Sequence, residues 1–307
     1  MGNVSENVVI AESMQAYGGG WTEVKLEMLA KYLAAYTTAL KNQPFQKWYI
    51  DAFAGTGYRE IEAEENATGL FTEQAEAEGA GFFDGSVRKA LQVTPSFGRY
   101  VFIEKSRKRM AELQKVSPDF PSLADKMVFR AGDANDQLPA LCRETDWKSV
   151  RAVLFLDPFG ANVDWSTMEA IARTPAIDVW VLFPVGIGIN RMLKLKPADI
   201  PQSWQNRLDR VFGTGDWRDA FYKTSRQKTL FDEETITAKV GDPIPAIADY
   251  YQQRLKTIFP QVVSNPRYLC NSKGSPMFLF TFAVSNPNPK AQALAIRIAQ
   301  HILGKGR

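Results

Sequence analysis

The chain has 307 residues, of which 45% are hydrophobic and 23% are charged, and this composition excludes a wholly disordered protein. Its 37 Lys and Arg residues and 34 Asp and Glu residues leave a net charge of +3, which is too small to predict a nucleic-acid or membrane partner. Two distant cysteines, Cys142 and Cys270, and one histidine, His301, exclude a disulfide scaffold, a cysteine-based metal site and a Ser-His-Asp triad. We therefore expect no metal site.

The N-terminal residues and the apolar stretches predict a protein without membrane segments. The sequence MGNVSENVVIAES has neither the basic start nor the apolar run of a signal peptide. The longest apolar stretch, residues 176–190, contains Asp178 and is shorter than the roughly 18–20 residues that span a bilayer. We expect a soluble, cytoplasmic protein with no membrane partner.

The first predicted element is a helix within an N-terminal extension, residues 1–45. Leu26, Leu29, Leu33 and Tyr36 recur at steps of three and four residues, which is the spacing of one helical face. Pro44 follows the end of that helix and separates it from the next part of the chain.

Residues 46–185 contain five short apolar runs that predict strands. Helix-length segments separate these runs, and such alternation is typical of βαβ units in a parallel sheet with both faces covered. The runs are residues 48–53, 99–104, 127–130, 152–156 and 177–184. We therefore expect residues 46–185 to form a Rossmann-like core.

The end of the chain, residues 261–307, predicts a different strand pairing. Residues 261–269 and 277–284 are β-rich and are separated by a loop too short for a parallel crossover, so they predict an antiparallel hairpin. Asn288 and Pro289 then begin a last helix. Five parallel strands closed by such a hairpin are typical of class I methyltransferases. The predicted fold is therefore α/β, with a mostly parallel seven-stranded sheet.

Two charged insertions interrupt this scheme. Residues 58–84 hold eight acids against one base, a net charge of −7, which is typical of a solvated loop. Residues 186–230 hold nine bases and four acids, a net charge of +5, within a region that we expect to be a helical insertion, residues 186–260. The near-neutral total therefore hides two regions of opposite charge.

A glycine turn directly after the first strand predicts a cofactor site. Gly55 and Gly57 allow a ligand to approach the backbone closely, where amide groups can face its polar atoms. A ribose needs a carboxylate at the end of the next strand, about 20 residues after such glycines. Glu104 follows Gly57 by 47 residues, and by 20 once the 27 residues of the 58–84 insertion are left out. Glu104 is thus the predicted ribose ligand; the alternative is a solvent-facing strand end.

The end of the third strand favours S-adenosylmethionine (SAM) over NAD(P). In a methyltransferase-like site, Asp133 would contact the adenine amino group and Ala134 would pack beside the ring. A dinucleotide site has a third glycine three residues after Gly57, and this sequence has Glu60 there. We therefore expect SAM as the cofactor, with an NAD(P)-dependent oxidoreductase as the less favoured alternative.

The fourth strand ends in Asp157-Pro158-Phe159-Gly160, which is the candidate catalytic motif. A carboxylate or proline carbonyl at this strand end can accept a hydrogen bond from an exocyclic amine and thereby orient the nitrogen lone pair towards a methyl donor. An aromatic ring beside it can stack on a planar base. Asp157, Pro158 and Phe159 are the predicted catalytic residues; the alternative is a turn with a space-filling Phe159.

These residues together resemble the three-Cys-motif partner proteins (TcmP), a bacterial family with a class I methyltransferase fold. The resemblance covers most of the chain and is carried by Trp21-Thr22-Glu23, Lys25-Leu26, Tyr32-Leu33, Tyr49 to Gly55, Phe102 to Lys105, and Phe155 to Gly160. It implies that Asp51, Ala52, Phe53 and Lys105 also belong to the cofactor site. It further implies a partner protein with a three-cysteine motif, of a radical-SAM-like iron–sulfur type.

The chain is more distantly similar to the ribosomal RNA adenine N6-methyltransferases of the RlmJ type. They too have a lysine-bearing helix before a Tyr-Ile-Asp strand, so the similarity implies that Lys25 reaches the cofactor site; the alternative is a solvated lysine on the helix surface. Those enzymes have Asp-Pro-Pro-Tyr where this chain has Asp157-Pro158-Phe159-Gly160, which looks more like the motif of tRNA guanine N2-dimethyltransferases. The exocyclic amines of both purines therefore stay open as methyl acceptors.

Two functions from different classes follow from these patterns. The first is a SAM-dependent methyltransferase that acts on an exocyclic base amine of RNA or DNA, with the basic residues of 186–230 on the nucleic-acid backbone. The second is a binding partner or specificity subunit of the three-cysteine protein, in which methyl transfer is weak or absent. The second function is motivated by Phe159-Gly160, which stand where the adenine N6-methyltransferases have Pro-Tyr.

Overall fold

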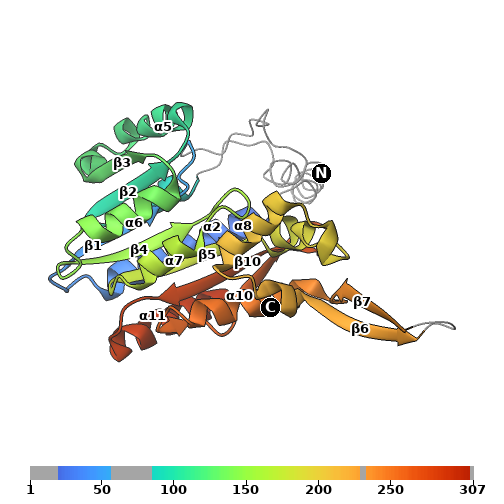
Figure 1. Cartoon of the computed structure of the whole chain (residues 1–307). Helices are drawn as coiled ribbons and strands as arrows, with labels where there is room; N and C mark the ends of the chain where they lie inside the picture. The colour runs from blue at the N-terminus through green and yellow to red at the C-terminus, as the bar shows by residue number, and fades with distance from the viewer. Residues whose placement is uncertain (1–19, 57–84, 229–232, 305–307) are drawn as a thin grey trace, which may run out of the picture.

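The computed structural model describes residues 20–56, 85–228 and 233–304. Within these ranges, helices cover both faces of a mixed β-sheet, which gives three layers (Figure 1). The strands are β1 (Gln46–Asp51), β2 (Arg99–Glu104), β3 (Met127–Ala131), β4 (Val150–Leu156), β5 (Ile177–Phe183), β6 (Tyr222–Lys228), β7 (Glu233–Lys239), β8 (Gln261–Val262), β9 (Arg267–Cys270) and β10 (Pro276–Val284). The α-helices are α2 (Gly20–Ala39), α4 (Ser86–Leu91), α5 (Arg107–Gln114), α6 (Ala134–Glu144), α7 (Trp165–Ala172), α8 (Gln202–Phe212), α9 (Trp217–Phe221), α10 (Pro243–Lys256) and α11 (Pro289–Gly304). Shorter helical turns are η1 (Ser117–Asp119), η2 (Pro121–Lys126), η3 (Val185–Asn190) and η4 (Pro197–Asp199).

The main sheet has eight strands in the order β3-β2-β1-β4-β5-β10-β8, with β9 paired to β10. The first five strands of that order are parallel, and β10 runs antiparallel to β5. The strand order reverses between β1 and β4, and in open α/β sheets such a point leaves a crevice at the carboxyl ends of the strands. The predicted Rossmann-like fold, with a parallel sheet closed by antiparallel strands, is confirmed.

The sixth strand expected at residues 261–269 is broken into two pieces. β8 pairs with β10 as far as Val262, and β9 pairs with β10 from Arg267 onward. Pro266 lies between the two pieces, and a proline has no N–H to donate to a ladder and disfavours continuation of a strand. The expected seven-stranded sheet therefore has eight strands, because one of its strands is interrupted.

The region 186–260, which we expected to be helical, is only partly so. It contains α8, α9 and α10, but also an antiparallel hairpin formed by β6 and β7, which extends away from the three layers (Figure 1). β-branched residues such as Thr235, Ile236 and Thr237 favour an extended backbone, which accounts for β7. The acidic insertion at 58–84 lies outside the described residues. In the described ranges, no helix combines the length and the apolar character needed to cross a membrane.

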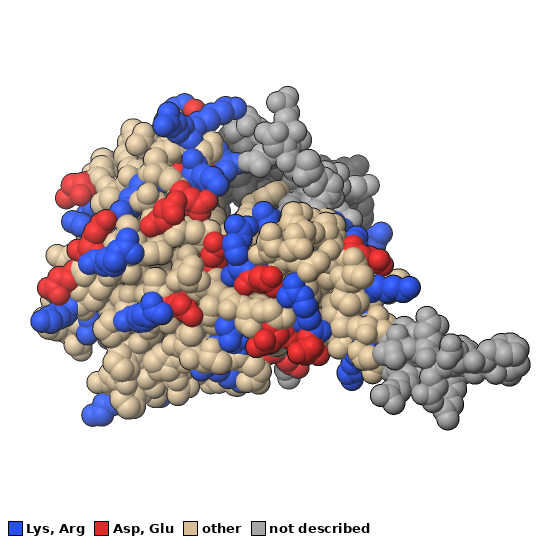
Figure 2. All heavy atoms as spheres, in the orientation of Figure 1, with Lys and Arg blue, Asp and Glu red and all other residues tan. Residues whose placement is uncertain are grey.

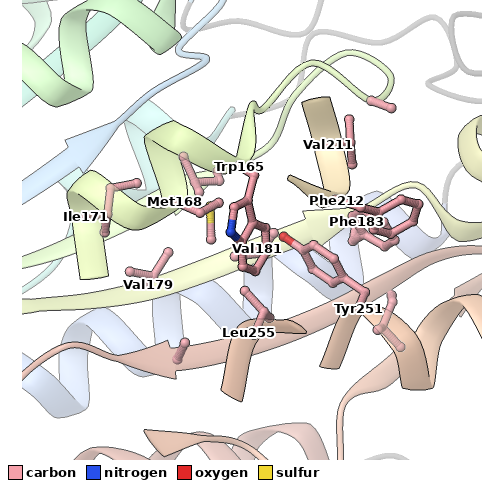
Figure 3. Packing of buried hydrophobic residues seen from close by; sticks show 14 of the residues in the cluster. Trp165, Met168, Ile171, Val179, Val181, Phe183, Val211, Phe212, Tyr251 and Leu255 are labelled. Carbon is pink, nitrogen blue, oxygen red and sulfur yellow. The ribbon is translucent and has the colours of Figure 1, made fainter. Parts of the chain in front are cut away.

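Both faces of the sheet are apolar, and each supports its own layer of helices. On one face, α6, α7, α8 and α10 pack over side chains such as Leu154. On the other face, α2, α4, α5 and α11 pack over side chains such as Trp180. Figure 3 shows part of the first layer, where the ring of Tyr251 on α10 stacks on that of Phe183 on β5 with centroids 3.6 Å apart. The two layers hold the carboxyl ends of β1–β4 in fixed positions.

One carboxyl group lies inside the layer formed by α2. Asp178 near the start of β5 is 8% exposed, and its Oδ2 accepts a hydrogen bond from the Tyr32 hydroxyl at 2.7 Å. Burial raises the pKa of Asp178 to about 7, although the hydrogen bond from Tyr32 opposes the rise. The group lies at the amino end of its strand, so it bears on stability rather than on the crevice.

Asp178→Asn should change how stability depends on pH. Because the folded-state pKa of about 7 lies above the ordinary value of 3.8, the folded protein holds a proton between these values that the unfolded chain has released. The stabilisation that this group provides is therefore complete below pH 3.8, the ordinary pKa, and disappears as the pH rises through the folded-state pKa of about 7. The free energy of unfolding of Asp178→Asn relative to the natural protein should rise by roughly 1–3 kcal/mol between about pH 5 and about pH 8.

Urea unfolding over that pH range measures the difference. Asp125→Asn, at an exposed position of η2, is the control and should show the same pH dependence as the natural protein. A difference for Asp178→Asn that stays constant with pH would contradict a protonated carboxyl at this position.

Candidate functional site

The carboxyl ends of β1, β2, β3 and β4 bring four acidic side chains to one edge of the sheet. Asp51 ends β1, Glu104 ends β2, Asp133 follows β3, and Asp157 follows β4. These four strands are neighbours in the sheet and run parallel, so their carboxyl ends must lie together. The sequence predicted all four acids as site residues, and the fold places them around the point where the strand order reverses.

Lys25 of α2 joins this edge through a buried ion pair. Its Nζ lies 2.6 Å from Oδ2 of Asp157, and the two side chains are 3% and 20% exposed. The same ammonium group lies 4.8 Å from the ring centre of Trp21, which adds a cation–π contact. The pair holds the carboxylate of Asp157 in one orientation and neutralises it. One turn earlier on α2, the hydroxyl of Thr22 is buried and has no hydrogen-bond partner among the described residues.

Asp51 lies deeper than the other acids and supports the turn that follows β1. It is fully buried, and its carboxylate accepts hydrogen bonds from the Tyr49 hydroxyl at 3.0 Å and from the Phe53 N–H at 3.2 Å. Burial raises its pKa to about 6, against the hydrogen bonds from Ser86, Phe53 and Tyr49. Asp51 thus fixes the path of residues 52–55, and its direct contact with a cofactor stays a prediction.

Glu104 is not a solvent-facing strand end, because it is 5% exposed. Its Oε2 accepts the Gly55 N–H at 3.1 Å, which joins the turn after β1 to the end of β2. Its Oε1 accepts the Ser106 N–H at 2.7 Å and lies 3.1 Å from Nε of Arg109. Gly55 has a φ of +62°, and a side chain built there would meet no atom of the described residues within 4 Å. Gly57 lies outside the described residues.

Asp133 and Lys105 form an exposed ion pair above the next strand end. Nζ of Lys105 lies 2.9 Å from Oδ2 of Asp133, and the side chains are 74% and 35% exposed. Asp133 also caps α6, because its Oδ1 accepts the Asn135 N–H at 2.9 Å. Burial acts to raise the pKa of Asp133, but the hydrogen bonds from Lys105 and Asn135 and the charge of Lys105 outweigh it and hold the pKa below its ordinary value. Ala134 beside it is buried.

The loop from β4 to α7 carries the candidate catalytic motif and is held by an asparagine that sequence analysis missed. The side-chain amide of Asn135 donates to the Asn162 carbonyl at 2.8 Å. Its Oδ1 accepts the Asp164 N–H and the Thr167 hydroxyl, both at 2.9 Å. Asn162 in turn donates to the carbonyl of Phe159. The start of α6 therefore fixes the loop. Asp133, the residue before α6, was the only signal in the sequence that pointed to the start of this helix.

The residues of the motif itself differ in exposure. Pro158 is buried, whereas Asp157 and Phe159 are half-buried, so a carboxylate oxygen and an aromatic ring both reach the edge of the sheet. Gly160 has a φ of +69°, a conformation that favours glycine and turns the chain away from the strand. Pro158 and Gly160 thus form the turn out of the sheet, and Asp157 and Phe159 are the groups that can meet a ligand.

A cavity of about 360 Å³ lies elsewhere in the molecule, beneath the C-terminal half of α6. Its lining includes Gln46, Trp48 and Arg99, which belong to the starts of β1 and β2. It therefore opens near the amino ends of the strands and does not coincide with the acids at the carboxyl ends.

No family model matches the chain, and no curated protein matches it. Solved structures resemble it at low identity. The Legionella pneumophila protein LPL1258, described with the family name DUF519, is 13% identical over 94% of each chain, with a TM-score of 0.46. An O-methyltransferase from Bacillus cereus, in complex with SAH, is 15% identical over 83% of this chain and 80% of its own, with a TM-score of 0.38. A putative methyltransferase from Escherichia coli is 12% identical over 69% of this chain and 86% of its own, with a TM-score of 0.28. At these values, the likenesses decide neither the family nor the substrate.

Lys25→Met should destabilise the protein by about 2–5 kcal/mol, because it leaves the carboxylate of Asp157 without its cation in a largely buried position. The double variant Lys25→Met/Asp157→Asn should recover a large part of that stability, since no unpaired charge remains. Urea unfolding of the two single variants and the double variant forms the cycle that isolates their coupling.

Lys31→Met is the matched control, because Lys31 pairs with Glu27 on the exposed side of the same helix, where the side chains are 55% and 64% exposed. It should change stability by no more than about 0.5 kcal/mol. Strictly additive effects of Lys25→Met and Asp157→Asn would show that the pair does not exist in solution.

Proposed function

We propose that this chain is a SAM-dependent methyltransferase that acts on an exocyclic amine of a nucleic-acid base. The observation that carries the proposal is the arrangement at the carboxyl ends of β1–β4. There a carboxylate restrained by Lys25 and an aromatic ring, Phe159, share one loop beside acids at three further strand ends. Ligands of open α/β sheets bind at this edge.

The residues at the edge fit SAM. Among the described residues, no atom lies within 4 Å of a side chain built at Gly55, so this part of the structure lets a ligand approach the backbone there. Oε2 of Glu104 accepts the Gly55 N–H, and a carboxylate oxygen has a second lone pair that can take a ribose hydroxyl. Asp133 is held by an exposed ion pair of small energy, so it can exchange Lys105 for the adenine amino group. The buried Thr22 hydroxyl near Lys25 has no hydrogen-bond partner within the described part of the chain, and it offers a further polar contact at this edge.

The chain's own residues would orient the acceptor. Bound SAM would supply a methyl group on a sulfonium, an electrophile that needs no metal. Lys25 engages Oδ2 of Asp157, which leaves Oδ1 as the acceptor for an N–H of the exocyclic amine. That hydrogen bond fixes the direction of the nitrogen lone pair, and the same carboxylate lies where the amine releases its proton. Phe159 would stack on the base, a contact worth about 1–3 kcal/mol.

SAM binding should depend on Glu104. Calorimetry with the full chain should detect SAM binding, and Glu104→Gln should weaken it about tenfold or more, because a hydrogen bond to a charged group contributes about 1.5–3 kcal/mol. Glu112→Gln, on the exposed part of α5 where it pairs with Lys115, is the control and should bind SAM normally. Labelled methyl groups from SAM should then appear in RNA or DNA, and Asp157→Asn should abolish the transfer.

The outcomes separate the two halves of the proposal. Absence of SAM binding, or binding that Glu104→Gln leaves unchanged, would contradict the cofactor half. Tight SAM binding without methyl transfer to RNA or DNA would contradict the substrate half and leave the cofactor half standing.

The second candidate function is a partner or specificity subunit of a three-cysteine protein. Two features support it: Lys25 already engages one carboxylate oxygen of Asp157, and the motif continues as Phe159-Gly160 rather than Pro-Tyr. Co-expression with the product of the neighbouring gene, followed by size-exclusion chromatography, should then give one complex. Separate elution together with independent methyl transfer would count against this role.

A further inference from the structure

Helix α8 of the basic region is fixed directly against the start of α7. Gly213, which ends α8, has a φ of +68°, and a side chain built there would lie 2.2 Å from Cδ1 of Trp165. Arg254 of α10 donates to the Phe212 carbonyl at 3.0 Å, and its guanidinium lies 4.5 Å from the ring centre of Trp165. Figure 3 shows Trp165, Val211 and Phe212 in this contact region. Because Trp165 follows Asp164 directly, α8 has a set position relative to the end of the β4–α7 loop.

Two arginines of α8 face that loop. Arg207 and Arg210 are three residues apart and therefore lie on one face of the helix. Nε of Arg210 lies 3.8 Å from Oδ1 of Asp164, a long ion pair between side chains that are 61% and 30% exposed. Arg207 is half-buried, and among the described residues its guanidinium has neither a hydrogen bond nor an ion pair within 4.0 Å. Of the two guanidinium groups, only that of Arg210 contacts the Asp164 carboxylate, whose charge also acts on Arg207.

The charges around Arg207 point to an uncompensated positive site. Burial lowers the pKa of Arg207, the charge of Arg210 lowers it further, and Asp164 offsets only part of this. Two other cations of residues 186–260 are held by the protein. Arg218 pairs with Asp209 at 2.9 Å, and Lys239 donates to the carbonyls of Asn190 and Leu193. Figure 2, in the orientation of Figure 1, shows Lys and Arg side chains among Asp and Glu side chains in the middle of the face, where α8 lies.

The carboxylate that pairs with Arg210 belongs to Asp164, at the end of the loop that carries the catalytic motif. The N–H of Asp164 is held by Asn135, and the same asparagine holds Asn162, which donates to the Phe159 carbonyl. The arginine pair and the ring of Phe159 are therefore tied to one rigid segment, residues 157–164. A ligand that reaches both would have an anionic group and a planar group, as a nucleotide within a strand does.

We propose that Arg207 and Arg210 form a phosphodiester-binding site that holds the nucleic-acid backbone beside the base presented to Asp157 and Phe159. The inference rests on the proposed function and names the residues that would hold the substrate chain. Guanidinium groups bind phosphate oxygens in a two-pronged manner, and a phosphate can replace the long, exposed contact with Asp164 at small cost.

The test is fluorescence anisotropy of labelled single-stranded RNA and DNA oligonucleotides of one sequence, titrated with the full chain at several salt concentrations. Arg207→Gln/Arg210→Gln should bind at least about tenfold more weakly, and the slope of log affinity against log salt should fall by roughly 0.7 for each phosphate that the variant no longer neutralises. Arg207→Lys/Arg210→Lys should keep most of the slope and still bind more weakly, since an ammonium group cannot bind in the two-pronged manner.

The matched control is Arg143→Gln/Arg173→Gln, which removes the same charge from exposed positions near the C-terminal ends of α6 and α7. It should bind the oligonucleotides as the natural protein does. Equally weakened binding in both double variants would overturn the site, because the effect would then be one of total charge. Failure of the natural protein to bind either oligonucleotide would overturn it as well.

Calorimetry with SAM separates this inference from the proposed function. The Arg207→Gln/Arg210→Gln variant should bind SAM normally, which also shows that it is folded. Normal SAM binding with unchanged oligonucleotide binding would overturn the arginine site alone. Absence of SAM binding in the natural protein would overturn the proposed function, whatever the oligonucleotides do. Tighter binding of the RNA or of the DNA oligonucleotide would identify which of the two nucleic acids the site holds.

Discussion

The buried ion pair between Lys25 and Asp157 is the contact on which the candidate site depends. A lysine that is 2% exposed must have a partner, because removal of an ammonium group from water costs several kcal/mol. The partner, Asp157, follows β4, which lies at the strand-order reversal. Lys25 lies on α2, which packs on the opposite face of the sheet from α7. The pair therefore joins α2, β4 and the β4–α7 loop, and it sets which oxygen of Asp157 faces outward.

The carboxylates of the other three acids have different hydrogen-bond and ion-pair partners, and these partners assign them different roles. Glu104 is braced by two backbone amides and by Arg109, which makes it a fixed acceptor between two strand ends. Asp133 is paired with an exposed lysine that a ligand can displace. Asp51 has no ion pair within the described part of the chain, and burial raises its pKa to about 6. It is thus the acid of the four that serves the turn after β1 rather than the surface.

Sequence patterns predicted the parallel strands, the closing antiparallel pair and the acids at the strand ends, because all of these follow from local hydrophobic runs and from residues beside them. Glu104 was predicted as a site residue only by leaving out the 58–84 insertion, which the charge of that segment marked, and its hydrogen bond from Gly55 was not predicted. The break at Pro266 was visible in the sequence but overlooked, since the apolar residues around it continue the strand pattern. The β6–β7 hairpin was missed because the charge of its region, rather than its β-branched residues, guided the prediction.

Other features depend on contacts that no local pattern contains. The side chain of Asn135 bonds to three residues that lie 27 to 32 positions further along the chain. Its role is apparent only once α6 and the β4–α7 loop are neighbours. The close approach of Gly213 to Trp165 likewise joins segments whose pairing is set by the packing of α8 on α7.

These two contacts have a joint consequence for the site. Asn135 fixes Asp164 from the side of the sheet, and Gly213 fixes α8 from the side of the basic region, so the loop of residues 157–164 is clamped between them. A phosphate that drew Arg210 away from Asp164 would act on the same segment that carries Phe159. Because closely packed elements transmit small displacements rather than absorb them, backbone binding and base orientation would be mechanically linked at this loop. The net charge of +3 gave no sign of this, since what matters is one local ion pair, between Arg210 and Asp164, with a second arginine on the same helix face.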